Sequence, residues 1–227
     1  MNCNKIIVFS NIKGGTGKTQ LCATAATFLL ECGNPVYVID ADIQQSLSRH
    51  HQRDLEAHPN ADKLWPVYFL DTSDIDHVKD IIGQVKKFNC IVLIDCPGNI
   101  NDPALQYIYE AADVAVVPME YNSDVVDATV MFGEVLKENC FQSKEKRIFF
   151  VPNKVSSVYE RQGAVRKARE DAYELLISKR HLGWLTPEIR MTTHMNGYST
   201  LDFLGYEKRK VVRDAFAPIV KFLKIGS

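Results

Sequence analysis

Short apolar runs alternate with longer amphipathic segments along the whole chain. The short runs are rich in β-branched and aromatic residues, and several are apolar at consecutive positions, which is typical of strands covered on both faces. We expect strands at residues 6–10, 36–40, 67–70, 90–95, 114–118 and 148–151.

The longer segments repeat apolar residues at helical spacing. One stripe is followed by Gly33, which is suited to ending a helix, and another is preceded by Ser73 and Asp74, either of which is suited to capping one. We expect helices at residues 18–32, 73–88, 102–112, 123–139, 159–180 and 206–224. Residues 44–62 are polar and are expected to form a helix, a mobile switch or both, whereas residues 186–204 are expected to be irregular.

This alternation predicts an α/β fold with a doubly wound, mostly parallel sheet and helices on both of its faces. Right-handed crossovers place the loops of functional interest at the C-terminal ends of the strands. We find no internal repeat, low-complexity tract or flexible linker in the sequence. We therefore expect one domain over residues 1–227.

Composition narrows the class of protein. The 227 residues carry 27 Lys+Arg and 28 Asp+Glu, a net charge of −1, so any nucleic-acid contact must come from a local patch. The polar start and the lack of a long apolar stretch favour a cytoplasmic protein. The six cysteines lack C-x-x-C spacing and are predicted to be mostly buried free thiols. The histidines and cysteines do not predict a metal centre or an iron–sulfur cluster.

A glycine-rich segment lies directly between the first expected strand and the first expected helix. It reads Lys13-Gly14-Gly15-Thr16-Gly17-Lys18-Thr19. Its glycines allow backbone N–H groups to approach phosphates closely, and the helix start behind them suits an anion. Lys18 can reach the β- and γ-phosphates, and the Thr19 hydroxyl can ligate Mg²⁺. The predicted nucleotide-binding residues are Gly14, Gly15, Thr16, Gly17, Lys18, Thr19 and Gln20.

Carboxylates end two of the expected strands. Asp40 and Asp42 follow the second strand, and Asp95 begins the sequence Asp-Cys-Pro-Gly that ends at Gly98. Hydrolysis of a nucleotide with Mg²⁺ requires carboxylates near the phosphates, to hold metal-bound water and to orient the attacking water. Their placement at one sheet edge with the phosphate loop therefore predicts a nucleotide hydrolysis site.

The phosphate loop departs from the ordinary pattern, because Ile12 stands where the early glycine is expected and Lys13 follows it. In this it resembles the deviant Walker A motif of the ParA/MinD ATPases. The resemblance implies that Lys13 reaches across a dimer interface to the other subunit's nucleotide.

The same resemblance assigns roles to the acidic residues. It implies that Asp42 positions the hydrolytic water, so that the catalytic set is Lys13, Lys18 and Asp42. It also implies that Thr19, Asp40 and Asp95 support Mg²⁺. The family often has Asp-Pro-Gln where this chain has Asp42-Ile43-Gln44, which we interpret as a tolerated variation that leaves the rigidity of this switch segment open.

The base is predicted to be adenine. The segment from Asn153 to Ser156 resembles the guanine-recognition motif of GTPases, but Ser156 stands where that motif needs a carboxylate. ParA-like proteins place an asparagine at this point, and we expect Asn153 to contact adenine. The expected cofactors are ATP and Mg²⁺.

A cluster of cations lies near the C-terminus. Residues 207–224 carry six cations and two acids, and a dimer would present the cluster twice for salt-sensitive, nonspecific DNA binding. The alternative is a solvated helix face with acidic partners. A second cluster comprises Arg161, Arg166, Lys167 and Arg169. The predicted DNA-binding residues are Arg190, Lys208, Arg209, Lys210 and Arg213.

The resemblance implies a ParA-like Mg²⁺-ATPase that forms a homodimer on ATP, binds DNA nonspecifically and releases it on hydrolysis. A centromere-binding or cargo adaptor protein is the expected partner, and nucleoid association is expected. A membrane role is disfavoured because the last helix has apolar residues spaced for packing and few terminal cations. The alternatives are a MinD-like membrane organiser, a factor of a conjugation or mobile-element system, a dethiobiotin-synthetase-type ligase and a signalling GTPase.

Overall fold

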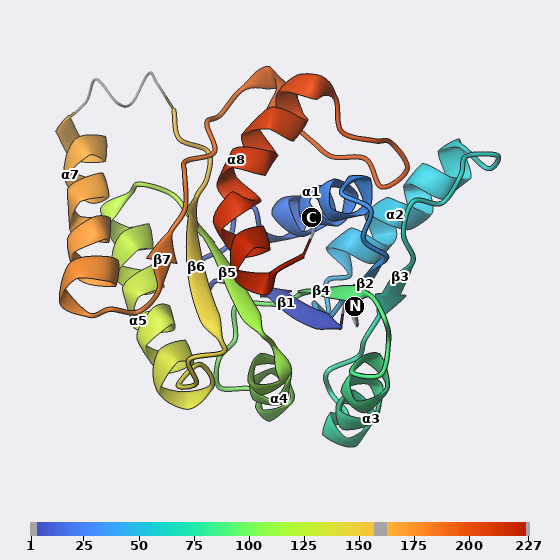
Figure 1. The fold of residues 1–227 in the computed structure, drawn as a ribbon, viewed down its shortest axis with the longest axis horizontal. Coiled ribbons are helices and arrows are strands. Elements are labelled where there is room, and N and C mark those ends of the chain that lie inside the picture. Colours follow the sequence, from blue (N-terminus) through green and yellow to red (C-terminus); the bar gives the residue numbers. More distant parts are fainter. Residues whose placement is uncertain (1–3, 157–162, 226–227) are drawn as a thin grey trace.

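A parallel sheet of seven strands forms the centre of the molecule (Figure 1). The computed structural model describes residues 4–156 and 163–225. The strands lie in the order β3-β2-β4-β1-β5-β6-β7, and every pair of neighbours is parallel. Their bounds are β1 Lys5–Phe9, β2 Val36–Asp40, β3 Val67–Phe69, β4 Ile91–Asp95, β5 Val114–Met119, β6 Arg147–Pro152 and β7 Trp184–Leu185.

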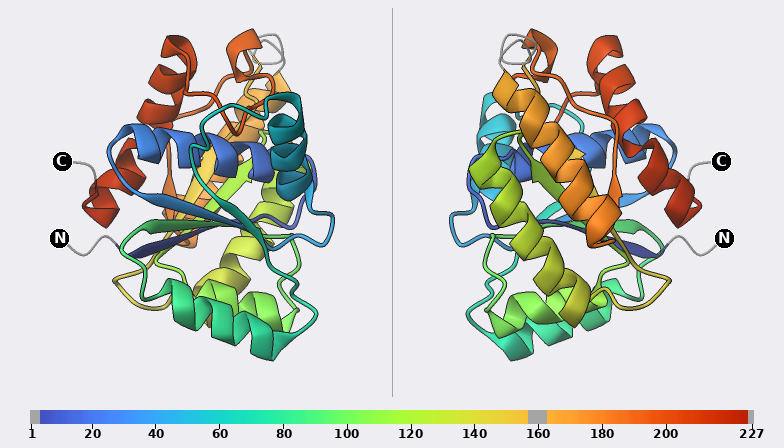
Figure 2. Two further views of the ribbon diagram at one scale, coloured as in Figure 1. Left: turned by 90° about the vertical axis from the view of Figure 1, so that its right-hand side faces the viewer. Right: turned by 90° about the vertical axis from the view of Figure 1, so that its left-hand side faces the viewer.

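Helices cover both faces of the sheet (Figure 2). On one face lie α1 (Lys18–Glu31), α2 (Ser46–Ala57) and α8 (Tyr206–Leu223), which share one hydrophobic core. On the other face lie α3 (Ile75–Val85), α4 (Pro103–Ala111), α5 (Ser123–Asn139), α7 (Gly163–Ala172) and the π-helical segment η1 (Tyr173–Lys179). A short 3₁₀ turn, η2, spans Thr193–Met195.

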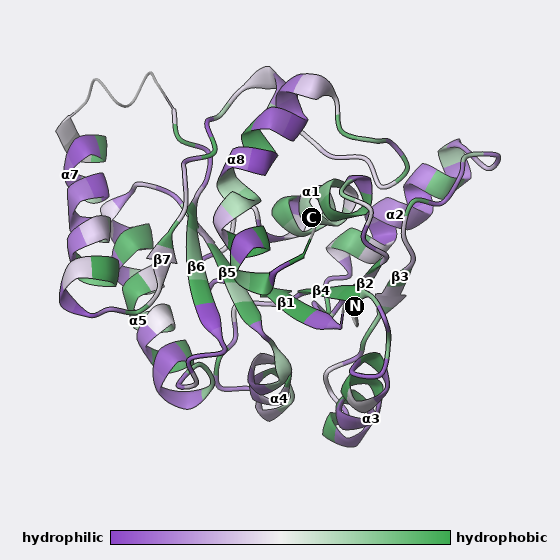
Figure 3. Ribbon diagram, in the orientation of Figure 1, coloured by the Kyte–Doolittle hydropathy of each residue, from purple (hydrophilic) through white to green (hydrophobic). Residues whose placement is uncertain are grey.

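The doubly wound α/β prediction is confirmed, and each of the six expected strands is present within a residue or two of its expected ends. The apolar character of the central strands is visible in Figure 3, and every residue of β4 and β5 is buried. The sequence pattern missed β7, because an edge strand of two residues shows no periodicity.

The helix predictions are confirmed with shifted ends. Asp74 caps α3, since its side chain accepts hydrogen bonds from the backbone of Asp76 and His77. The polar stretch that begins at residue 44 contains a helix, α2. The helix expected at 159–180 is instead α7 followed by the π-helical η1, and its first residues lie outside the described part of the chain.

The packing prediction for the last helix is also confirmed. Phe216, Ile219 and Leu223 of α8 are buried in the core that they share with α1. Among the described residues, the structure contains no helix with the length and apolarity needed to cross a membrane.

The cysteines are partly as expected. Cys22, Cys96 and Cys140 are buried, whereas Cys32 is exposed and Cys90 is intermediate. Cys3 lies outside the described residues.

Strand register brings the acidic strand ends to the phosphate loop. Asp40 at the end of β2 is paired in register with Asp95 at the end of β4, and Asp95 is paired with Phe9 at the end of β1. The chain continues from β1 toward β2 on one side, and β5 lies on the other side of β1. Such a reversal of strand order leaves a crevice at the carboxyl ends of the strands, where α/β proteins bind ligands.

Candidate nucleotide-binding site

The segment between β1 and α1 is held by the buried side chain of Asn11. Its amide nitrogen donates to the Pro118 carbonyl at 2.8 Å and to the Thr129 hydroxyl at 3.0 Å, while its amide oxygen accepts from the Lys13 backbone at 3.2 Å. These bonds tie the start of the loop to the end of β5 and to α5. The loop therefore enters its turn from a fixed position.

Gly17 requires both backbone freedom and space. Its φ is +94°, and a Cβ at this position would lie 2.4 Å from the amide nitrogen of Asn153. That nitrogen donates to the Thr16 carbonyl at 2.9 Å. Asn153 thus braces the phosphate loop from the end of β6, which the sequence did not predict, and its contact with adenine stays a prediction.

Lys154, next to Asn153, also touches the loop. Its ammonium donates to the Gly15 carbonyl and pairs with Glu120 at 3.2 Å. The sequence placed Lys154 only in a comparison with GTPases. Its structural role depends on tertiary contacts between β6, β5 and the loop.

The start of α1 is open to an anion. Gly17 precedes the helix without a side-chain cap, so the first N–H groups of α1 have no capping partner on that residue. The Lys18 ammonium donates to the Lys13 carbonyl at 3.3 Å and so curls back over the loop. In a P-loop this lysine meets the β- and γ-phosphates.

Asp40 organises the segment that follows β2. One of its carboxylate oxygens accepts from the Asp42 backbone at 3.2 Å and the other from the Ser48 backbone at 2.8 Å. Burial raises the pKa of Asp40, and the hydrogen bonds from Ser48 oppose that shift. Asp40 therefore fixes both the Asp42 turn and the start of α2. The side chain of Asp42, which accepts from the Gln44 backbone at 2.9 Å, remains partly exposed.

Asp95 is buried, and neither of its carboxylate oxygens has a hydrogen-bond partner within 3.5 Å among the described residues, although the Thr19 hydroxyl is near enough to favour its charged form. Burial raises the pKa of Asp95 to about 7. The nearby Thr19 hydroxyl and Lys18 ammonium oppose that shift, whereas the Asp40 carboxylate adds to it. A buried acid with free oxygens beside a hydroxyl and a second carboxylate fits Mg²⁺, which prefers oxygen ligands and retains water.

The segment after Asp95 is anchored by two side-chain hydroxyl groups. The Pro97 carbonyl accepts from the Ser10 hydroxyl at 3.1 Å and from the Tyr109 hydroxyl at 3.2 Å. A Cβ on Gly98 would lie 2.2 Å from the Asn11 carbonyl oxygen, so only glycine allows this close approach to the phosphate loop. Sequence reasoning missed Ser10, Asn11 and Tyr109. Ser10 and Asn11 could have been noticed, because they are polar residues directly after an apolar strand. Nothing in the sequence distinguishes Tyr109 from the other residues of its helix.

An open depression of about 610 Å³ lies above these groups. Most of the predicted nucleotide-binding residues line it, together with residues of the two acidic segments. Its lining comprises Ile12, Gly14, Gly15, Gly17, Lys18, Thr19, Gln20, Asp42, Ile43, Gln44, Ser46, Pro97, Gly98 and Tyr198. Thr16, Asp40, Asp95 and Asn153 are buried around it. The side chain of Lys13 does not line it.

Residues 195–200 connect this depression to α8. Gln20 donates to the carbonyls of Met195 and Gly197, so it holds this loop to the start of α1. From α2, the His50 ring lies 4.2 Å from the Tyr198 ring. Asp54, also on α2, accepts from the Thr200 hydroxyl at 2.7 Å. The loop before α8 is therefore fixed to both helices that border the nucleotide site.

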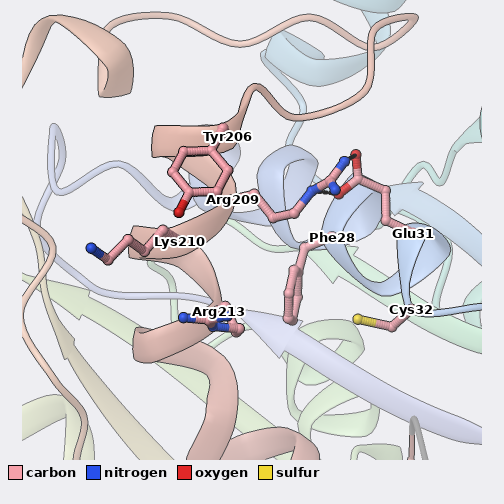
Figure 4. Close-up of a pocket in the computed structure, with 7 residues that line it drawn as sticks. All are labelled: Phe28, Glu31, Cys32, Tyr206, Arg209, Lys210 and Arg213. Carbon is pink, nitrogen blue, oxygen red and sulfur yellow. Dashed lines mark hydrogen bonds and ion pairs between the residues drawn. The ribbon is translucent and has the colours of Figure 1, made fainter.

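The predicted DNA-binding residues differ in whether their side chains already bind other parts of the protein. Arg209 pairs with Glu31 of α1, with Nε and Oε2 2.8 Å apart (Figure 4). Lys208 donates to the Gly197 carbonyl at 2.8 Å, and burial lowers its pKa. Lys210 is exposed and takes part in none of the ion pairs found among the described residues. Arg213 is exposed and lies 3.4 Å from Asp214.

The other cations are distributed more widely. Arg190 is exposed and forms an isolated parallel bridge with Val155. On α7, Arg166 pairs with Glu170 at 3.0 Å, and Arg169 pairs with Glu188 at 2.6 Å. Arg161 lies outside the described residues.

Known structures share this architecture. A protein of Borrelia burgdorferi assigned to plasmid partition and bound to AMPPNP has a TM-score of 0.71 and 18% identity, covering 96% of this chain and 98% of that chain. McdA of Cyanothece, in complex with ATP, has a TM-score of 0.74 and 15% identity over 100% and 99% of the two chains. The MinD cell division ATPase of Pyrococcus furiosus has a TM-score of 0.68 and 20% identity over 96% and 99%. At these identities the likeness establishes the fold.

Sequence comparison adds to the structural likeness. An uncharacterised ATP-binding protein of Methanocaldococcus jannaschii is 26% identical over 197 residues, which is 76% of this chain and 70% of that protein. Residues 7–176 match the family described as the CobQ/CobB/MinD/ParA nucleotide binding domain. This match includes the phosphate loop, both acidic segments and Asn153, so the chain belongs to the CobQ/CobB/MinD/ParA family of nucleotide-binding domains and has the ParA/MinD ATPase fold.

Proposed function

We propose that this protein is a ParA-like, Mg²⁺-dependent ATPase that dimerises on ATP, binds DNA nonspecifically and resets on hydrolysis. The observation that carries the proposal is the buried, unpartnered carboxylate of Asp95 beside Lys18 and Thr19, beneath an open depression. A buried carboxylate without hydrogen-bond partners lowers the stability of the protein when no cation is bound, and a bound cation compensates its charge.

The residues divide the chemistry of ATP hydrolysis among them. The loop N–H groups and Lys18 bind the phosphates, and Asp42 orients the attacking water. Thr19, Asp40 and Asp95 would hold Mg²⁺, which supplies neutralisation of phosphate charge when bound. ATP is favoured over GTP because Ser156 replaces the carboxylate that guanine recognition needs. The solved relatives include complexes with AMPPNP and ATP.

Dimerisation serves as the switch in this proposal. Lys13 belongs to the phosphate loop, where its carbonyl accepts from Lys18, and the resemblance to ParA/MinD proteins implies that its side chain acts at the nucleotide of a second copy. The γ-phosphate would then lie between subunits, and its loss would release them. The plasmid partition protein among the structural relatives supports DNA as the docking surface. A centromere-binding or cargo adaptor protein is the partner that the resemblance to ParA proteins implies.

The proposal is tested by phosphate release measured with and without duplex DNA, alongside DNA binding with ATP, with ADP and with no nucleotide. We expect Mg²⁺-dependent release, with DNA binding only in the ATP state. DNA binding that is equal in all three nucleotide states would contradict the switch. Turnover of GTP in preference to ATP would contradict the assignment of the base.

A further inference from the structure

A small cavity lies between the end of α1 and the first turns of α8, away from the nucleotide depression. Its volume is about 250 Å³. In Figure 4 the Arg209 side chain of α8 points toward Glu31 of α1, whereas the Lys210 side chain extends away from α1. The lining residues are Phe28, Glu31, Cys32, Tyr206, Arg209, Lys210 and Arg213.

The inner walls of this cavity are fixed. Phe28 is 5% exposed and packs against Phe216, with 6.5 Å between ring centroids. Glu31, whose side chain is 8% exposed, holds Arg209 by an ion pair and accepts from the Leu204 backbone at 2.8 Å. Arg209 therefore forms part of the wall, and its charge is already compensated.

The outer rim carries an aromatic ring and two cations. Tyr206 is 78% exposed. Lys210 and Arg213 are exposed and follow it at positions four and seven residues later, which places all three on one face of α8. Neither Lys210 nor Arg213 has an ion pair that crosses from α8 to another element in the described part of the chain.

An aromatic ring beside cations is suited to binding single-stranded nucleic acid. Bases stack on aromatic rings regardless of sequence, and the phosphates between them bind lysine and arginine. Contact with duplex backbone alone needs only cations, so it leaves the exposed ring and the hollow behind it without a function.

We propose that this cavity, with its rim of Tyr206, Lys210 and Arg213, is a subsite for one unstacked base of a DNA strand. The base lies against the Tyr206 ring, and the adjoining phosphates bind Lys210 and Arg213. This inference rests on the proposed DNA-binding function and adds to it a preference for single-stranded or locally opened DNA.

The test compares a labelled single-stranded oligothymidylate with a duplex of equal length, by fluorescence anisotropy with ATP and Mg²⁺. Tyr206→Ala is expected to weaken single-strand binding about tenfold and duplex binding by less than about twofold, because it removes one stacking contact. Tyr206→Phe keeps the ring and is expected to keep the affinity. Lys210→Gln combined with Arg213→Gln is expected to weaken both and to flatten their salt dependence.

A matched control is available on the opposite face of the sheet. Tyr173 of η1 is 58% exposed, and Tyr173→Ala is expected to change neither affinity. The exposed thiol of Cys32 gives a second readout. Single-stranded DNA is expected to slow its alkylation by N-ethylmaleimide, measured by mass spectrometry, and this protection is expected to disappear in Tyr206→Ala.

The outcomes separate this inference from the proposed function. If neither DNA binds in the ATP state, the proposed function fails and the subsite fails with it. If duplex binding depends on Lys210 and Arg213 while Tyr206→Ala leaves single-strand affinity and Cys32 protection unchanged, only the subsite is wrong. Binding to phosphatidylglycerol vesicles that requires Tyr206, with no single-strand binding, would also overturn it.

Discussion

The nucleotide site and the N-terminal part of α8 both contain several charged residues, yet these residues have different roles in the fold. At the nucleotide site, the acids occupy strand ends in register, and Asp95 is buried with both carboxylate oxygens unpartnered. On α8, the Arg209 side chain forms an ion pair with Glu31, whereas Lys210 takes part in none of the ion pairs found among the described residues.

This difference shows what spacing and charge can each predict. A motif that combines glycines, a lysine and strand ends predicts where its residues lie in the fold, because such a loop requires one backbone geometry. A count of cations along a helix specifies only composition. Arg209 and Lys210 are adjacent in sequence, and only the packing of α1 against α8 separates their roles.

The largest effect is expected at Gly17. Gly17→Ala places a methyl group on a residue with φ of +94° and 2.4 Å from the Asn153 amide, so the phosphate loop must shift. We expect ATP affinity, measured by isothermal calorimetry, to fall about 100-fold or more. Gly83→Ala in α3 is the control, because nothing lies within 4 Å of a Cβ there. Unchanged ATP affinity in Gly17→Ala would show that the loop is not the phosphate cradle.

The next effect concerns hydrolysis alone. Asp42→Ala is expected to lower phosphate release by about 10²–10³-fold, because the water loses its orienting carboxylate. ATP and DNA affinities should stay within about twofold of the unaltered protein. Asp80→Ala, at an exposed position of α3, is the control. Normal phosphate release from Asp42→Ala would remove this residue from the catalytic set.

Asp95 gives a prediction for pH. The pKa of Asp95 is about 7 in the folded protein, against an ordinary value of 3.8. Between about pH 4 and pH 7, the carboxyl group therefore keeps its proton in the folded protein but has lost it in the unfolded chain. Stability of the protein in EDTA without nucleotide therefore falls as pH rises from about 4 to about 7.

Asp95→Asn removes this dependence. Above pH 7 we expect the variant to be more stable than the unaltered protein by about 1–4 kcal/mol, measured by urea unfolding. The difference should shrink as the pH is lowered toward 4. An equal difference at both ends of this range would mean that Asp95 is ionised throughout, and Asp80→Asn provides the exposed comparison.

The smallest effects separate neighbouring cations on α8. Arg209→Ala leaves the buried Glu31 without its partner and is expected to lower the free energy of unfolding by about 1–3 kcal/mol. Lys210→Ala is expected to leave stability unchanged and to weaken duplex binding instead. If Arg209→Ala weakens DNA binding more than Lys210→Ala at equal stability, the ion pair opens in the complex and our distinction is wrong.

Much of the fold followed from local pattern, because consecutive apolar runs and helical stripes are set by burial. What the sequence could not show was contact between distant segments. Asn153 braces Thr16 across 137 positions, and Tyr109 bonds Pro97 from a helix with an ordinary amphipathic pattern. Neither contact can be predicted from the spacing of residues along the chain. The π-helical geometry of η1, a segment that contacts α5 and β7, was likewise not predicted from the sequence.

The most direct measurement is the molar mass of the Asp42→Ala protein in solution with saturating ATP and Mg²⁺, by light scattering after size exclusion. One chain has a mass of 25.7 kDa. We predict twice that mass with ATP, the single-chain mass with ADP, and the single-chain mass with ATP when Lys13→Ala is added. A single-chain mass with ATP, or a dimer that survives Lys13→Ala, would contradict a nucleotide shared between two subunits.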